Sequence, residues 1–205
     1  MLDVCTPGTG GMMPLPGRWL SCAVLRAEGR SVLLDCGEGT QIALKAIHWG
    51  FRSIDAICLS HYHADHVSGL VGLLLMLANS ERDAPVTIFG PPGLETVLAA
   101  QRVLAPVLPF DVYCVPLSPG QEFTVGPFRG TTAAGRHSLP TLAYRLTLPR
   151  GRLFLPERAR ALGVPVQLWR RLQHGETVTF DRQTVTPDMV LGPPRRGISV
   201  AYVTD

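Results

Sequence analysis

The chain has 205 residues, of which 46% are hydrophobic and 17% charged, a balance that excludes global disorder and suits one domain, or one domain with an excursion. Its longest apolar run, residues 69–78, has about half the length of a membrane span, and the N-terminus lacks a signal-peptide layout, so we expect a cytoplasmic protein without membrane contact. The net charge of +3 is uneven: residues 150–196 hold nine arginines against four acids, which fits either a solvated surface or a polyanionic partner.

The first two thirds of the chain alternate short strands with helices. Turn signals and hydrophobic periodicity predict strands and helices in this order: strands 2–5, 21–26 and 31–35, helix 40–48, strand 54–60, helix 67–79, strand 86–89, helix 94–104, and strands 112–115, 122–125 and 142–148. Strands that alternate first with hairpins and later with helices predict a layered α/β (α+β) fold.

The pattern changes after residue 148. Two short helical pieces, 157–162 and 166–173, lie among turn signals and carry the arginine excess, and a strand returns at 198–204. We therefore expect residues 1–148 to form the first part of the main domain, 149–194 a basic projecting arm, and 195–205 a return strand of the main domain.

Five cysteines form an odd count with no closely spaced pair. Four of them lie in apolar, strand-like surroundings, which favours buried reduced thiols over disulfides or a thiolate metal site.

A histidine-rich loop follows the predicted buried strand 54–60. It reads His61-Tyr62-His63-Ala64-Asp65-His66, so three of the six histidines fall within six positions. Alternate residues of a continuing strand would point to opposite faces, and only a tight loop lets these side chains converge. Imidazole and carboxylate donors without thiolate suit Zn²⁺ in an open, catalytic site, whereas the alternative is a histidine-rich surface loop.

This loop resembles the His-x-His-x-Asp-His signature of the metallo-β-lactamase superfamily, which implies an αββα sandwich with two metal ions at one edge. The resemblance implies His61 and His63 as ligands of the first ion, and Asp65 and His66 as ligands of the second. His137, just before a predicted strand, is similar to the third histidine ligand of the first ion. Asp205, at the end of the last strand, is similar to the carboxylate that bridges both ions, the alternative being an ordinary acid.

The chemistry implied is hydrolysis by a hydroxide shared between two Zn²⁺ ions, with Mn²⁺ as another possible metal. Asp65 is expected to act also as the catalytic group that holds or deprotonates the attacking water. Asp35 and Glu38 are candidates for orienting the ligating imidazoles, although turn and helix-cap chemistry explains them equally well.

Further stretches resemble the ribonuclease Z family, endonucleases that remove 3′ trailers from precursor tRNA. They include Gly8-Thr-Gly10, residues 35–41, residues 61–74, and His137-x-x-Pro140 with Tyr144-Arg145. Residues 159–194 are similar to the tRNA-binding arm of that family and coincide with the arginine-rich segment. The resemblance implies a precursor tRNA substrate and a homodimer in which the arm of one subunit holds tRNA for the other.

Arginines of the arm are the candidate phosphate contacts, because guanidinium groups match phosphate geometry. The nominated residues are Arg152, Arg158, Arg160, Arg170 and Arg171. Each could equally belong to a solvated face.

The sequence also departs from the family pattern. Val164-Pro165 lacks the Gly-Pro element that usually follows, and the chain ends at Asp205, before the family's last strands and a further histidine ligand. We therefore expect a C-terminally incomplete sandwich that lacks the final ligand of the second ion and is weakly active or inactive in this form. Alternatives left open are a general phosphodiesterase, a lactone or thioester hydrolase on the same scaffold, and an inactive RNA-binding remnant.

Overall fold

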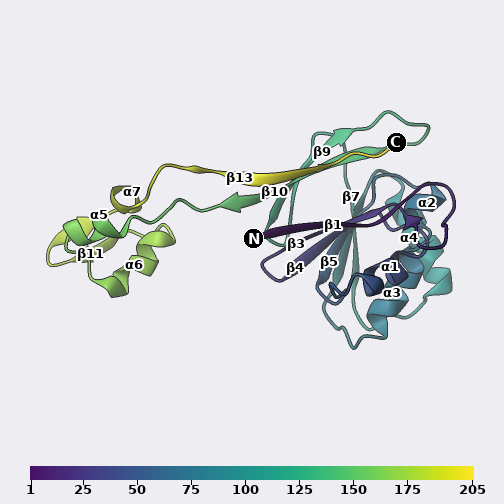
Figure 1. Ribbon diagram of the computed structural model, residues 1–205, viewed down its shortest axis with the longest axis horizontal. Coiled ribbons are helices and arrows are strands. Elements are labelled where there is room, and N and C mark those ends of the chain that lie inside the picture. Colours follow the sequence, from purple (N-terminus) through teal and green to yellow (C-terminus); the bar gives the residue numbers. More distant parts are fainter. The chain divides into compact units, whose positions relative to one another are not determined.

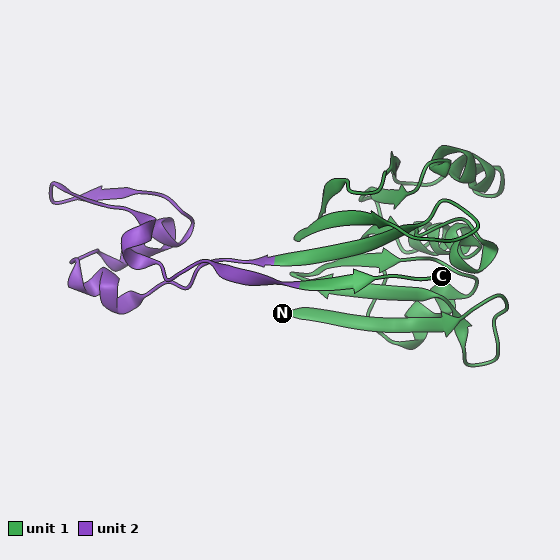
Figure 2. Ribbon diagram, turned by 90° about the horizontal axis from the view of Figure 1, so that it is seen from above, with its two compact units in different colours: residues 1–148, 199–205 green, residues 149–198 purple.

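A computed structural model describes residues 1–205 and divides the chain into two compact units. Unit 1 contains residues 1–148 and 199–205, and unit 2 contains residues 149–198 (Figure 2). Each unit has its own buried apolar cluster. None of the helices is long and apolar enough to pass through a lipid bilayer.

Unit 1 is built on a seven-stranded sheet in the order β2-β1-β3-β4-β5-β6-β7. Its strands are β1 (Leu2–Gly10), β2 (Trp19–Leu20), β3 (Cys22–Ala27), β4 (Arg30–Leu34), β5 (Ile54–Cys58), β6 (Val86–Gly90) and β7 (Val112–Pro116). Strands β4 to β7 are mutually parallel, so their carboxyl ends lie at one edge of the sheet. Loops at such an edge are where open α/β sheets usually place their ligands.

Helices cover one face of this sheet, as Figure 1 shows. They are α1 (Thr40–Ala46), α2 (Ala64–Val67), α3 (Leu70–Ala78) and α4 (Leu94–Leu104). Side chains of β3 alternate between the faces: Val24 packs towards the helices, whereas Leu25 packs towards the second sheet. The near-continuous apolar strands of the sequence are therefore buried on both faces.

A second sheet, in the order β13-β10-β9-β8, packs on the other face of the first through the cluster that contains Leu25, Phe128 and Tyr144. Its strands are β8 (Glu122–Val125), β9 (Phe128–Ala134), β10 (Leu142–Arg150) and β13 (Arg195–Tyr202). Helices, first sheet and second sheet follow one another as the first three layers of the predicted αββα sandwich, which confirms the predicted fold class.

Unit 2 surrounds a small core of six buried residues, to which Ala159, Leu172 and Val190 belong. Its elements are α5 (Pro156–Ala161), α6 (Val166–Gln173), a hairpin of β11 (Val178–Phe180) and β12 (Gln183–Val185), and α7 (Pro187–Val190). The two short helices were predicted from sequence, whereas the hairpin was not. Because β10 and β13 run across the boundary between the units, unit 2 is an insertion between two neighbouring strands.

The helix predicted for residues 67–79 is confirmed as α3, but it begins three residues later than predicted, because the turn at Ser68 and Gly69 separates it from α2, which was not predicted from sequence. The backbone N–H of Gly69 donates to the carbonyl of Cys36 at 2.9 Å, and a Cβ atom on Gly69 would lie 2.0 Å from the carbonyl oxygen of Gly37. This close approach requires glycine and holds the turn after β4 against the helix that carries His66.

All five cysteines are free thiols, in agreement with the predicted reduced state. Cys22, Cys36 and Cys58 are buried, and desolvation raises the pKa of the Cys22 thiol to about 11. Such thiols are poor nucleophiles and poor metal ligands at neutral pH.

Candidate metal centre

The histidine-rich loop begins where β5 ends, at the carboxyl edge of the first sheet. The backbone N–H of Leu59 donates to the carbonyl of Phe89 at 2.8 Å, and the N–H of Leu142, on β10, donates to the carbonyl of Ser60 at 2.9 Å. The strand end is thus held by both sheets, and the next residue, His61, is fully buried. The loop therefore starts from a rigid position, as a site with fixed geometry needs.

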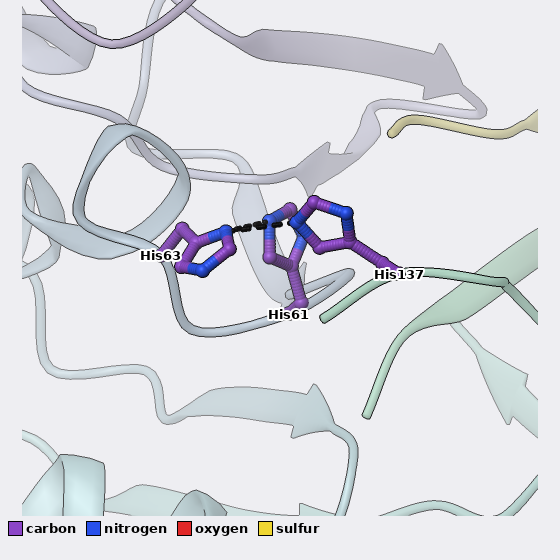
Figure 3. A group of neighbouring side chains, drawn as sticks. All are labelled: His61, His63 and His137. Carbon is purple, nitrogen blue, oxygen red and sulfur yellow. Dashed lines mark hydrogen bonds between the residues drawn. The ribbon is translucent and has the colours of Figure 1, made fainter. Parts of the chain in front are cut away.

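Three imidazole rings meet at this loop, with their nitrogens pointing towards one another (Figure 3). Nδ1 of His63 lies 3.2 Å from Nε2 of His61 and 2.9 Å from Nε2 of His137. In a tetrahedral zinc site with Zn–N bonds of about 2.0–2.1 Å, neighbouring nitrogens are roughly 3.3 Å apart. The three rings therefore fit one divalent ion.

A second group of donors adjoins the first. Oδ2 of Asp205 lies 3.9 Å from Nε2 of His61 and 3.6 Å from Nε2 of His66, so this carboxylate stands between the two histidines. Oδ2 of Asp65 lies 3.7 Å from the same nitrogen of His66. The structure thus brings together the six side chains that the sequence indicated as metal ligands: five lie in two groups of converging donors, and Asp65 joins them through its approach to His66. They come from three segments of the chain.

Burial and neighbouring charges shift the pKa of three of these groups, and the shifts of His61 and Asp65 favour the form that can bind a metal ion. Burial lowers the pKa of His61, and the neighbouring imidazoles add to that effect, so this ring is favoured in its neutral form. The pKa of Asp65 is lowered: burial acts against this, but the Met12 N–H, 2.9 Å from Oδ2, and the nearby His66 outweigh it. For His66, burial opposes protonation, while the hydrogen bond to Asp35 raises its pKa overall.

Two bacterial proteins named ribonuclease Z are similar to this chain over its whole length. Ribonuclease Z of Lachnoclostridium phytofermentans is 48% identical over 211 residues, which cover 100% of this chain and 68% of the relative. Ribonuclease Z of Lachnospira eligens is 48% identical over 206 residues, with the same coverage. The chain belongs to the ribonuclease Z family.

Other similarities agree with this membership. The structure of the short form of human tRNase Z matches with a TM-score of 0.63 and 30% identity, over 71% of this chain and 64% of the human chain. A metallo-β-lactamase fold protein of Bacillus subtilis, with a TM-score of 0.59 and 23% identity, shares the fold. A family model described as anti-Pycsar protein Apyc1 matches residues 2–107, which include the His61–His66 loop but not His137 or Asp205. The fold and the ribonuclease Z family together imply divalent metal binding.

Asp35 links two of the histidines to the interior of this ribonuclease Z family member: His66 directly, and His61 through Ser60. Its carboxylate is fully buried at the end of β4 and accepts hydrogen bonds from the N–H of Ser60 at 2.6 Å and from the Ser60 hydroxyl at 2.8 Å. The Nδ1 atom of His66 lies 2.7 Å from Oδ2 of Asp35. A carboxylate behind a ligating histidine fixes the tautomer and orientation of the ring. Glu38, the other candidate for this role, is exposed and contacts none of the histidines.

Three contributors to the site were absent from the sequence-based prediction. Ser60 lies behind His61, Met12 donates its backbone N–H to Asp65, and the hydroxyl of Tyr202 donates to Asp35. Ser60 could have been suggested by its place next to His61. Tyr202 is 167 positions from Asp35, and only the packing of the two sheets brings them together.

The five nominated arginines of unit 2 differ in their surroundings. Arg152 donates to the carbonyl of Gly192 and to the Asp188 carboxylate, Arg171 pairs with Glu176 at 2.8 Å, and Arg160 lies over the Trp169 ring. The guanidinium groups of Arg158 and Arg170 are exposed and form no ion pair within the chain. Arg152 therefore has a structural role inside unit 2, whereas Arg158 and Arg170 are free to contact a ligand.

Replacing His63 by alanine should abolish tight metal binding, because Nδ1 of His63 lies between the nitrogens of His61 and His137. Loss of a residue that only supports a metal ligand weakens metal affinity by about 10–100-fold. Because His63 is proposed to be a ligand itself, we expect the affinity for Zn²⁺ to fall by more than about 100-fold. Competition with a chromophoric chelator measures this change. The exposed His174 provides the matched control, and equal affinities of His63→Ala and His174→Ala would contradict the assignment.

Proposed function

We propose that this protein is a zinc-dependent endoribonuclease that removes 3′ trailers from precursor tRNA. The observation that carries the proposal is the convergence of six histidine and aspartate side chains at one sheet edge, in a chain similar to ribonuclease Z along its whole length. The proposed ions are two Zn²⁺, with Mn²⁺ as a possible substitute, because the donors are imidazoles and carboxylates.

The proposed ligands divide into two sets that share one carboxylate. His61, His63 and His137 would hold the first ion, Asp65 and His66 the second, and Asp205 would contact both. When bound, the two ions would supply Lewis-acid charge for the phosphate oxygens and lower the pKa of a water molecule.

The side chains of this site would then direct the water to the phosphorus. Asp65 would accept a proton from the attacking water as general base, since its lowered pKa keeps it ionised at neutral pH. The Met12 N–H would hold that carboxylate in place. As the bond between phosphorus and the 3′ oxygen breaks, that oxygen would take up a proton from solvent water, and Asp65 would return its proton to solvent. The tRNA then ends in a 3′ hydroxyl after the discriminator base, and the trailer carries the 5′ phosphate.

Unit 2 is proposed to bind the tRNA through charge and shape, as a basic surface can grip the phosphates of A-form RNA. Its arginine excess supports this, and the exposed Arg158 on α5 and Arg170 on α6 are the strongest candidates. Free thiols, which are typical of reducing compartments, and a precursor tRNA substrate favour a cytoplasmic location.

Cleavage of a precursor tRNA with a 3′ trailer tests the proposed activity. We expect a single cut after the discriminator base when the protein is in excess over RNA and Zn²⁺ or Mn²⁺ is present, with loss of the cut in chelator or in His63→Ala. A bis(nitrophenyl) phosphate ester provides the comparison. Turnover of this ester without cleavage of the tRNA would instead support a general phosphodiesterase, and no turnover of either would contradict the proposal.

Replacing Arg158 and Arg170 together by alanine should weaken tRNA binding. Each lost phosphate contact reduces the slope of log K against log salt by about 0.7–0.9, so a change of up to roughly two is expected for the pair. Filter binding at several salt concentrations measures the slope. The double variant Gln167→Ala/Gln173→Ala, also on α6 and without charge change, is the control; equal slopes for both double variants would contradict RNA contact by these arginines.

We further propose a homodimer. Exposed apolar side chains on the helical layer, Ile42 on α1, Leu75 on α3 and Val103 on α4, could be covered by a second subunit. Sedimentation equilibrium should give twice the mass of one chain, and Leu75→Glu should lower it towards the monomer because a buried charge opposes association. A monomeric mass for the unaltered chain at all concentrations would contradict the dimer.

A further inference from the structure

The hydrogen bonds around Asp35 have a definite direction. Because the Ser60 hydroxyl donates its only proton to Oδ2 of Asp35, its oxygen can only accept from Nδ1 of His61, which lies 2.9 Å away. The ionised Asp35 likewise accepts from Nδ1–H of His66. Both rings therefore carry their proton on Nδ1 and keep a lone pair on Nε2. These Nε2 atoms are the ones that face Asp205.

Tyr202 adds a donor to this carboxylate from the second sheet. Its hydroxyl donates to Oδ2 of Asp35 at 2.8 Å, and Tyr202 ends β13 three residues before Asp205. Burial and the Asp35 charge raise the pKa of this hydroxyl, so it remains protonated and is a permanent donor. Between Tyr202 and Asp205, Val203 is 72% exposed and gives this segment little packing. The Tyr202 hydroxyl is thus a direct link from the segment that bears Asp205 to the carboxylate behind His66.

We propose that Tyr202 is a positioning residue: its hydroxyl fixes Asp205 relative to His66 and His61 by tying the end of β13 to Asp35. The proposal rests on the proposed metal-binding role of the site. Packing alone is the competing explanation, since the Tyr202 ring also contacts the core between the two sheets. Phenylalanine keeps the ring and removes only the hydrogen bond, so Tyr202→Phe separates the two explanations.

Zinc affinity measured by chelator competition tests this role without RNA, so a failure to cleave tRNA would leave the result valid. We expect Tyr202→Phe to bind zinc about 10–100-fold more weakly, the usual effect of losing a group that supports a ligand. Tyr144→Phe is the matched control, because the Tyr144 hydroxyl is also buried and donates at 2.7 Å, but to the backbone carbonyl of Leu59. It should leave zinc affinity within about twofold of the parent, although it loses a comparable hydrogen bond.

A double-mutant cycle tests whether Tyr202 acts through Asp205. If Tyr202 acts through Asp205, the two substitutions should not be additive. The loss of zinc-binding free energy in the double variant Tyr202→Phe/Asp205→Asn should then be clearly smaller than the sum of the losses in the two single variants. Thermal melting of the metal-free variants shows whether Tyr202→Phe and Tyr144→Phe are folded and equally stable. Additive losses in the cycle, an unchanged affinity in Tyr202→Phe, or equal losses in the two tyrosine variants would overturn the proposal. A parent chain that binds no zinc would overturn the metal centre itself.

Discussion

The buried carboxylate of Asp35 is the constraint on which the geometry of the site depends. An ionised group with no exposure to solvent is strongly unfavourable unless its oxygens are hydrogen-bonded, and here the donors come from the end of β5, from α2 and from β13. Satisfying one charge therefore fixes the relative positions of three segments. The same interactions set the tautomers of His61 and His66, so the stability of the interior and the order of these proposed metal ligands have a common origin.

The sequence was sufficient for the features that depend on local pattern. The His61–His66 loop, the strand before it and the helices α1 and α4 follow from residue type and periodicity within short windows. The separation of α2 from α3 was missed because it results from the contact between Gly69 and Gly37, which are far apart along the chain. For the same reason, no local pattern could show that Tyr202 contacts Asp35, since this pair depends on how the two sheets pack.

Composition likewise overstated the charge that unit 2 can offer to a ligand. Counting arginines treats all of them as equivalent, but Arg152 is occupied by carbonyls and by Asp188, and Arg171 by Glu176. An arginine that bonds inside its own unit contributes to the long-range field but has few N–H groups left for a phosphate. The number of free guanidinium groups, rather than net charge, is the relevant quantity for a basic surface of this kind.

Unit 2 begins and ends on β10 and β13, which are neighbours in the second sheet. Since the pairing of these strands already brings the two ends of the insertion together, the entropic cost of closing the intervening segment grows only slowly with its length. A segment attached in this way can lengthen, shorten or change its sequence while the strands that support the proposed metal ligands keep their register. The topology thus leaves unit 2, the part proposed to contact the substrate, free to diversify, and leaves the part that bears the histidine-rich loop under a separate set of physical requirements.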